Sequence, residues 1–267
     1  MSYLALLIGF KYSDEKELPS TIIDLIKVNT FVSKGDGFVV MLSDIEDIKS
    51  KIEGVSHIPI YSKNNLEQAI RSLNIQNETK MVVYYTGHGE VDSKMLLPNG
   101  ELYPLLEFRN LITSLCKENI EILFIIDCCY SGTLGLPYIL TEDTCNFKLL
   151  PNINYILKNK HSFILQSVIC LSSSMRSQKS ASVDNKGSLF TNYLIDACMS
   201  GVLNLSTISK IVRSKIMGDN LNSNQSMILT SSYPIPPILW TWVTNPKVNI
   251  YINDPTSTLI LELTPNL

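Results

Sequence analysis

The sequence predicts an α/β protein with a mostly parallel central sheet and helices on both faces. Apolar strand-like runs alternate along the chain with stretches of helical periodicity, and this alternation is typical of such sheets. Two of the runs, 81–85 and 122–126, lead directly into polar motifs. In an open α/β sheet, ligands and chemistry gather beyond the carboxyl ends of the strands. We therefore expect a site at one edge of the sheet.

The elements of the first half can be placed in order. Residues 3–10 form a core strand, because the run is too short for a membrane span and has no basic flank or cleavage site. Asn64 or Asn65 can cap a helix, since the apolar residues that follow recur at helical spacing. A second helix with the same spacing is expected at 105–115, just before the strand that carries the second motif.

The second half is less regular at its start. Residues 133–160 lose periodicity and gather Gly, Pro and Asn, so we expect a long loop there, and long loops are usually functional or disordered. A strand, two helices and a last core strand are then expected at 162–171, 190–199, 206–217 and 227–230. The tail 241–267 is predicted to add a β-hairpin to a domain that spans 1–240.

Composition limits the partners and the compartment. The 267 residues, 45% hydrophobic and 18% charged, can bury a large core. The formal net charge of −3 shows no basic surplus, so we expect no nucleic-acid partner and no membrane attachment. The six cysteines show no zinc-ligand spacing, and free thiols in a reducing cytoplasm are the simpler account. We expect a monomer.

The two motifs carry a histidine and a thiol. His88 follows the run 81–85, and Cys129 follows the run 122–126. If these runs are neighbouring parallel strands, about 4.8 Å apart, the two side chains can project over one cleft as a base and a nucleophile. Strand alternation would turn Cys128 toward the packing. The pattern is that of a cysteine hydrolase.

Together the motifs Tyr-Thr-Gly-His-Gly and Asp-Cys-Cys-Tyr-Ser-Gly resemble those of caspase-type peptidases of clan CD, and within them the metacaspases and orthocaspases. The likeness runs from Leu4–Gly9 through Gly37–Asp44 to Gly187–Thr191, and covers roughly residues 3–240. It implies the caspase-like fold and a cysteine endopeptidase that works through a thioester. His88 would exchange the proton, and the N–H groups of Gly89 and Cys129 would form the oxyanion hole.

The resemblance also implies cleavage after arginine or lysine. Asp127 stands two residues before the thiol, where metacaspases carry aspartate and animal caspases glutamine. Asp24 occupies the place of a second pocket aspartate, Thr21 stands where the family has cysteine, and Thr86 replaces a pocket serine. Ser173 lies where the loop that lines the substrate would begin. Two nearby carboxylates repel unless a cation lies between them, and a guanidinium can bond both.

Two further expectations concern calcium and processing. Many metacaspases need calcium, but Glu118 and Glu121 alone would make a poor site for a hard cation, so we expect activity without calcium, any other metal or an organic cofactor. Self-cleavage is expected in the aperiodic segment after the thiol, at Lys148, Lys158 or Lys160, because an exposed extended backbone can enter an active site.

A different class of function is the main alternative: a catalytically silent caspase-like module that binds peptides and regulates partner proteases. Intact His88 and Cys129 count against it. Tyr130 counts for it, since metacaspases usually carry histidine at that position and caspases arginine. Ser131 does not indicate a serine hydrolase, because Gly-x-Ser-x-Gly is absent.

Overall fold

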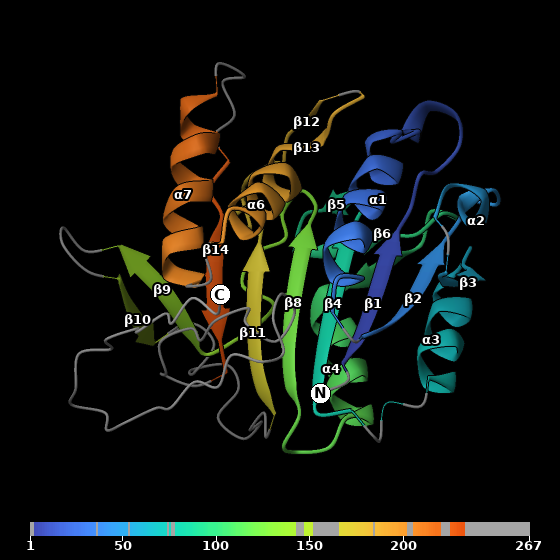
Figure 1. Ribbon diagram of the computed structural model, residues 1–267, viewed down its shortest axis with the longest axis horizontal. Helices are drawn as coiled ribbons and strands as arrows, with labels where there is room; N and C mark the ends of the chain where they lie inside the picture. Colours follow the sequence, from blue (N-terminus) through green and yellow to red (C-terminus); the bar gives the residue numbers. More distant parts are fainter. Residues whose placement is uncertain are drawn as a thin grey trace, which may run out of the picture.

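The protein is built around one large sheet (Figure 1). The structure is a computed structural model, and it describes residues 3–35, 37–52, 54–73, 75, 78–142, 147–151, 166–183, 185–201, 205–219 and 225–232. Within this part of the chain, the large sheet has nine strands in the order β10-β9-β14-β11-β8-β4-β1-β2-β3. The six strands from β11 to β3 are parallel, and β14, β9 and β10 are antiparallel to their neighbours.

The strands of this sheet are β1 (Leu4–Gly9), β2 (Phe38–Ser43), β3 (Ser56–Pro59), β4 (Lys80–Thr86), β8 (Glu121–Asp127), β9 (Tyr138–Glu142), β10 (Phe147–Pro151), β11 (Ser167–Ser172) and β14 (Ile228–Ser231). Short strands form two smaller sheets, β5 (Gly89–Glu90) with β6 (Lys94–Leu96) and β7 (Leu102–Pro104), and β12 (Ser182–Val183) with β13 (Gly187–Ser188). The helices are η1 (Asp14–Lys16), α1 (Ser20–Val32), α2 (Ile48–Lys51), α3 (Lys63–Ser72), α4 (Leu105–Leu115), α6 (Leu189–Met199) and α7 (Leu205–Gly218).

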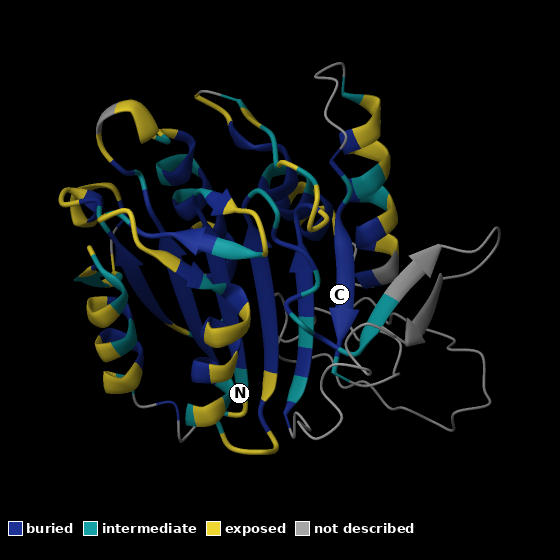
Figure 2. Ribbon diagram, turned by 180° about the vertical axis from the view of Figure 1, so that it is seen from behind, coloured by how far each residue is buried: buried dark blue, intermediate teal, exposed yellow. Residues whose placement is uncertain are grey.

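Helices cover both faces of the sheet. Those of one face, α1, α6 and α7, lie in front of it in Figure 1, and α3 and α4 cover the other face, seen in Figure 2. Strand β1 shows why the sheet needs both layers. Its residues Leu4, Leu6 and Ile8 pack with α3 and α4, whereas Ala5 and Leu7 pack with α1 and α6. Each face of the strand is apolar, and the predicted fold class is confirmed.

The parallel register brings the two motifs to one edge of the sheet. In β4 and β8, which are direct neighbours as predicted, Thr86 is paired with Asp127. Gly9 of β1 is paired with Thr86 on the other side. Residues that follow these three strand ends are therefore presented side by side, as expected for an α/β sheet.

Two predictions about local structure are wrong. Helix α3 begins at Lys63 and is capped by Ser62, whose Oγ accepts the N–H of Asn65 at 3.3 Å. Ser62 takes this role because its extended backbone lets the hydroxyl turn back onto the first turn, while Asn65 already lies within the helix. Likewise, α7 begins at Leu205, one residue before the start expected from the sequence.

The aperiodic segment after the thiol is also not simply a loop. It contains β9 and β10, an antiparallel hairpin whose strand β9 pairs with β14. The hairpin escaped prediction because its strands are short and their sequences, YILTE and FKLLP, show no strict alternation of apolar and polar residues. The predicted hairpin at 241–267 and the domain boundary at 240 lie outside the described residues.

Candidate active site

The candidate catalytic pair, His88 and Cys129, lies just beyond the paired ends of β4 and β8. His88 and Cys129 each lie two residues past the pair of Thr86 and Asp127. Between the two loops there is no room for a side chain: a Cβ added to Gly89 would lie 1.9 Å from the carbonyl oxygen of Cys129. A glycine is needed for this close approach. The loops that carry the base and the thiol are thus packed against each other.

His88 is held by five contacts, one of which is the Leu96 N–H that donates to its carbonyl at 3.1 Å. Its Nε2 lies 2.8 Å from the carbonyl oxygen of Lys16, and because a carbonyl only accepts, Nε2 carries the proton and Nδ1 of the neutral ring is left as the acceptor. The main-chain N–H of His88 donates to the Tyr12 hydroxyl at 2.8 Å. Its carbonyl accepts from the Tyr85 hydroxyl at 2.8 Å, and its ring lies 4.8 Å from that of Tyr12. The base has one defined orientation.

The two adjacent thiols differ in their surroundings. Cys128 is 2% exposed and belongs to the core, so burial raises the pKa of its thiol well above the usual value. Cys129 is half-buried, and its pKa is raised by burial, while the Ser180 N–H, at 3.4 Å from the sulfur, and the charge of Lys179 act in the opposite direction. The thiol of Cys129 donates in turn to the Ser180 carbonyl at 3.8 Å.

Two carboxylates lie buried beside the catalytic pair. Asp24 comes from α1 and Asp127 from the end of β8, and they are 1% and 3% exposed. Burial, followed by the charge of Asp127, raises the pKa of Asp24 to about 8, and burial also raises the pKa of Asp127. Neither carboxylate forms an ion pair with Lys or Arg among the residues that the structure describes. The pair is a candidate site for a cation.

Hydroxyl and amide groups hold these carboxylates in place. Asp24 accepts from the Thr86 hydroxyl at 3.3 Å and from the Ser188 N–H at 2.9 Å. Asp127 accepts from the hydroxyls of Thr191 at 2.7 Å, of Ser180 at 3.0 Å and of Ser188. Ser188 therefore bridges the two aspartates. These bonds favour the charged forms and oppose the effect of burial.

The other residues expected to bind substrate are placed nearby but point to different partners. Thr21 is fully buried one turn before Asp24, and its hydroxyl donates to the carbonyl of Phe10 at 3.0 Å. Ser173 is fully buried, and its hydroxyl donates to the carbonyl of Cys128 at 3.2 Å. It also favours the charged form of Asp127. Both hydroxyls therefore bind main-chain carbonyls near the site.

The predicted processing sites are only partly covered by the structure. Lys148 lies in β10, where it is paired with Thr141 of β9. Lys158 and Lys160 lie outside the described residues.

Sequence reasoning missed several residues that shape the site. Ser180, Ser188 and Thr191 were not predicted to bind the carboxylates, and Tyr12 and Lys16 were not predicted to hold the base. Ser188 and Thr191 did carry a signal, since they lie in Gly187–Thr191, one of the segments that resembles the metacaspases. No signal identifies Lys16, because it contributes only a main-chain carbonyl.

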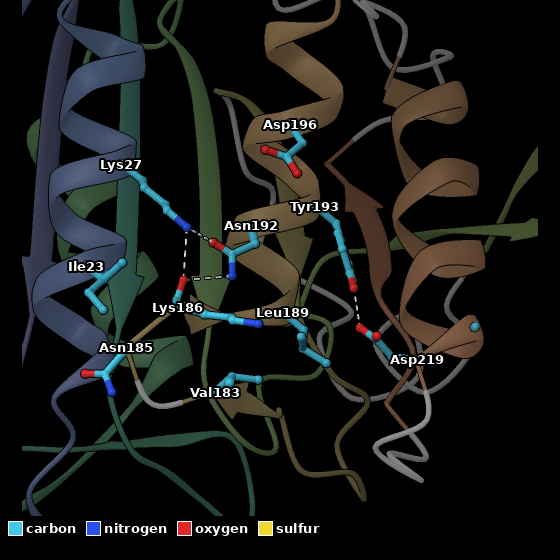
Figure 3. Close-up of a pocket in the computed structure, with 11 residues that line it drawn as sticks. Ile23, Lys27, Val183, Asn185, Lys186, Leu189, Asn192, Tyr193, Asp196 and Asp219 are labelled. Atoms are coloured by element: carbon cyan, nitrogen blue, oxygen red, sulfur yellow. Dashed lines mark hydrogen bonds between the residues drawn. The ribbon is translucent and has the colours of Figure 1, made fainter.

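A cavity of about 720 Å³ adjoins the helix that carries Asp24 and the hairpin that carries Ser188 (Figure 3). It is bordered by α1, by the β12–β13 hairpin, by α6 and by the end of α7. In it, the Lys27 ammonium donates to the Lys186 carbonyl at 2.9 Å and to the Asn192 side chain (Figure 3). Neither His88 nor Cys129 lines this cavity. The hydrogen bond from Lys27 to Lys186 links α1 to the hairpin that carries Ser188.

Metal ligands and membrane spans were sought within the described part of the chain. It contains no group of three or more His, Cys, Asp or Glu side chains placed to hold a metal ion. No described helix has the length and apolar character to span a bilayer.

The fold and the paired motifs define a peptidase of the caspase type. A family model described as the caspase domain matches residues 2–233. The chain therefore belongs to the caspase-domain family, a family of cysteine peptidases that act on proteins, and the predicted resemblance is confirmed at this level.

Solved structures agree with this fold. A protein from Geobacter sulfurreducens is 15% identical with a TM-score of 0.58, and the match covers 88% of this chain and 96% of that one. Caspase-1 from Spodoptera frugiperda is 11% identical with a TM-score of 0.56, and the match covers 88% of both chains. The caspase-like fold is confirmed. No curated protein sequence matches the chain significantly.

Proposed function

We propose that this caspase-domain protein is an endopeptidase that cleaves after arginine or lysine, as metacaspases do. The observation that carries this proposal is the buried pair of Asp24 and Asp127. Asp127 lies two residues before the thiol, Ser188 bridges it to Asp24, and neither carboxylate has a Lys or Arg ion-pair partner among the described residues. A guanidinium placed between them would relieve their repulsion and could bond both oxygen pairs in its planar fork. An aspartate side chain would meet like charge.

The bond-breaking steps follow from the orientation of the base. Nδ1 of His88 takes the proton of the Cys129 thiol, and the thiolate attacks the carbonyl carbon before the scissile bond. The N–H groups of Gly89 and Cys129 donate to the resulting oxyanion. Collapse of the tetrahedral intermediate breaks the C–N bond, and His88 returns the proton to the leaving amine. Water, deprotonated by His88, then hydrolyses the thioester and restores the thiol.

A matched set of fluorogenic peptides tests the specificity. The peptides differ only in the residue before the cleaved bond, which is Arg, Lys, citrulline or Asp. We expect Arg and Lys peptides to be cleaved, and citrulline, which has the shape of arginine without its charge, to be cleaved at least about 100-fold more slowly. Equal cleavage of the Arg and citrulline peptides would show that shape, not charge, is recognised. Preference for Asp would refute the pocket.

An active-site probe separates the enzyme from the silent binding module. An arginyl chloromethyl ketone should alkylate wild-type protein at Cys129 and leave Cys129→Ala unmodified. A wild-type protein that binds the peptide part reversibly but is never alkylated would favour the binding module.

Further parts of the proposal concern assembly and activation. We propose a cytoplasmic monomer; β9 and β10 extend the sheet beyond β14, so β14 itself is not free to pair with a second chain. We expect activity without calcium. Self-cleavage is proposed after Lys148, Lys158 or Lys160, and incubated wild-type protein should yield these fragments while Cys129→Ala stays whole.

A further inference from the structure

One loop of the chain, residues 11–18 after β1, supplies three of the five contacts that hold His88. Tyr12 contributes its hydroxyl to the main chain of His88 and its ring to the imidazole, and Lys16 contributes the carbonyl that accepts from Nε2. We infer that Tyr12 is a positioning residue for the base and that Asp44, which does not touch His88, fixes Tyr12 and the loop. The kinetic part of this inference rests on the proposed peptidase function.

Asp44 holds the start of the loop by both oxygens of its carboxylate. Directly after β2, it accepts the N–H of Lys11 through Oδ1 and the N–H of Tyr12 through Oδ2, each at 2.7 Å. The loop is closed at its far end, where the N–H of Leu18 donates to the carbonyl of Lys11 at 2.7 Å. Two charge-assisted bonds to adjacent N–H groups fix the direction of the chain at this point.

The backbone of Tyr12 explains why such a restraint is needed. Its φ of +60° lies in the left-handed region, which is unfavourable for a bulky residue and persists only where the surroundings enforce it. The resulting bend carries the ring to His88, 4.8 Å between centroids. There the buried hydroxyl accepts from the His88 N–H at 2.8 Å and donates to the carbonyl of Leu96 at 2.9 Å. Both hydrogen-bonding functions of the phenol are therefore satisfied.

The same bend places the Lys16 carbonyl. Four residues after Tyr12, the chain returns to the imidazole, and this carbonyl selects the tautomer with the proton on Nε2. The ring face, the main chain and the tautomer of His88 are thus set by one restrained loop. A loosened loop should leave the ring free to adopt the other tautomer, in which Nδ1 is protonated and cannot take the thiol proton.

The principal test compares Asp44→Asn with Asp47→Asn. An amide has one acceptor oxygen in place of two, so Asp44→Asn can no longer bind both N–H groups. Asp47 is exposed and pairs with Lys51, and its only interaction with the loop among the described residues is the weak attraction of the Lys11 charge, without a hydrogen bond to the main chain, so it provides a matched control. We expect Asp44→Asn to lower kcat about tenfold or more with KM within about threefold, because a misplaced base affects the chemical step. Asp47→Asn should behave as wild type.

A second measurement reports on the imidazole without relying on turnover. In protein labelled with ¹⁵N-histidine, the signals of His88 can be assigned by their loss in His88→Gln. Wild type should show a single neutral tautomer with the proton on Nε2, and Asp44→Asn should show a mixture of both. If the wild-type protein proves to have no peptidase activity, this spectrum still decides whether the loop positions the base.

A third variant keeps the inference testable if Asp44→Asn does not fold. Tyr12→Phe retains the ring and removes the hydroxyl that accepts from His88, and should lower kcat about tenfold with little change in KM. Tyr12→Leu removes both the ring and the hydroxyl and should lower kcat further. The kcat of Tyr12→Phe, which keeps the ring, should lie between those of Tyr12→Leu and wild type. The inference would be overturned if Asp44→Asn had both the kcat and the ¹⁵N spectrum of wild type. If Asp44→Asn is unfolded, the same result in Tyr12→Phe would overturn it.

Discussion

The candidate catalytic pair and the carboxylate pair meet beside the carboxyl ends of β4 and β8, where Asp24 comes from α1, yet the two pairs are held in different ways. The ring of His88 and the sulfur of Cys129 bind main-chain groups of Lys16 and Ser180. Asp24 and Asp127 are held chiefly by side-chain hydroxyls. The reacting side chains are thus bound by main-chain groups, and the side chains of Tyr12 and Tyr85 act on His88 through its main chain and its ring face. Substitutions near the pocket should therefore alter selectivity before they alter catalysis.

The largest effect is expected at the thiol itself. Cys129→Ala removes the nucleophile and should lower kcat by about 10⁴-fold or more. Cys128→Ala should retain most of the activity, since that side chain is buried in the core and loses only packing. Initial rates with an arginyl peptide measure both. A Cys128→Ala enzyme that is folded but inactive would show that Cys129 is the wrong assignment of the nucleophile.

A large effect on selectivity is expected from the charge of Asp127. Asp127→Asn should lower kcat/KM for an arginyl peptide about 100-fold, because one charge-assisted contact to the substrate is lost. The rate of alkylation of Cys129 by iodoacetamide should change much less, since the thiol is still present and its main-chain contacts do not involve this side chain. An Asp127→Asn enzyme that kept its full preference for arginine over citrulline would show that another residue recognises the charge.

A smaller effect distinguishes side-chain from main-chain contacts. Ser188→Ala removes the hydroxyl that donates to Asp127 and that caps α6, and should raise KM for arginyl peptides about tenfold. Lys16→Ala should leave kcat and KM within about twofold, because only its carbonyl contacts His88 and its side chain is exposed. The comparison fails if Lys16→Ala is the more damaging of the two substitutions.

The smallest effect is expected from pH. The folded protein binds a proton at Asp24 more tightly than the unfolded chain, since its pKa is raised from 3.8 to about 8. The stability that this proton contributes is complete below about pH 4 and is lost as the pH rises toward 8. The unfolding temperature of wild type should thus fall over this range more steeply than that of Asp24→Asn.

Substrate binding should follow the opposite trend in the same range. A cationic side chain needs a charged Asp24, so KM for an arginyl peptide should fall severalfold between pH 6 and pH 8. A citrulline peptide provides the control, because it carries no charge to pair with the carboxylate. Parallel pH profiles for the two peptides would contradict the role of Asp24.

What could be predicted from the sequence depended on whether the contacts are local. The runs that form β4 and β8 are apolar and end in polar motifs, so the pattern of residues alone indicates that His88 and Cys129 are neighbours. Contacts such as Ser188 to Asp127 join segments far apart in the chain, and no periodicity reports them. Main-chain partners such as the Lys16 carbonyl are available at every residue, and so leave no trace in the sequence.

The errors have a similar origin. Ser62 is hard to recognise as a cap because Asn64 and Asn65 have equally suitable side chains, and only the backbone at the helix start distinguishes them. The hairpin of β9 and β10 resembles a loop in sequence because its short strands show no strict alternation of apolar and polar residues. Tertiary contacts decide both cases.

The close approach of Gly89 to the carbonyl of Cys129 has a consequence for the life of a newly made chain. The two loops come from segments about forty residues apart, and they can interlock only after β4 and β8 have paired. Non-local pairing of this kind is slow compared with the formation of local structure. During synthesis, therefore, the thiol and its base remain apart, and the chain cannot cut itself or its neighbours before the centre of the sheet is complete.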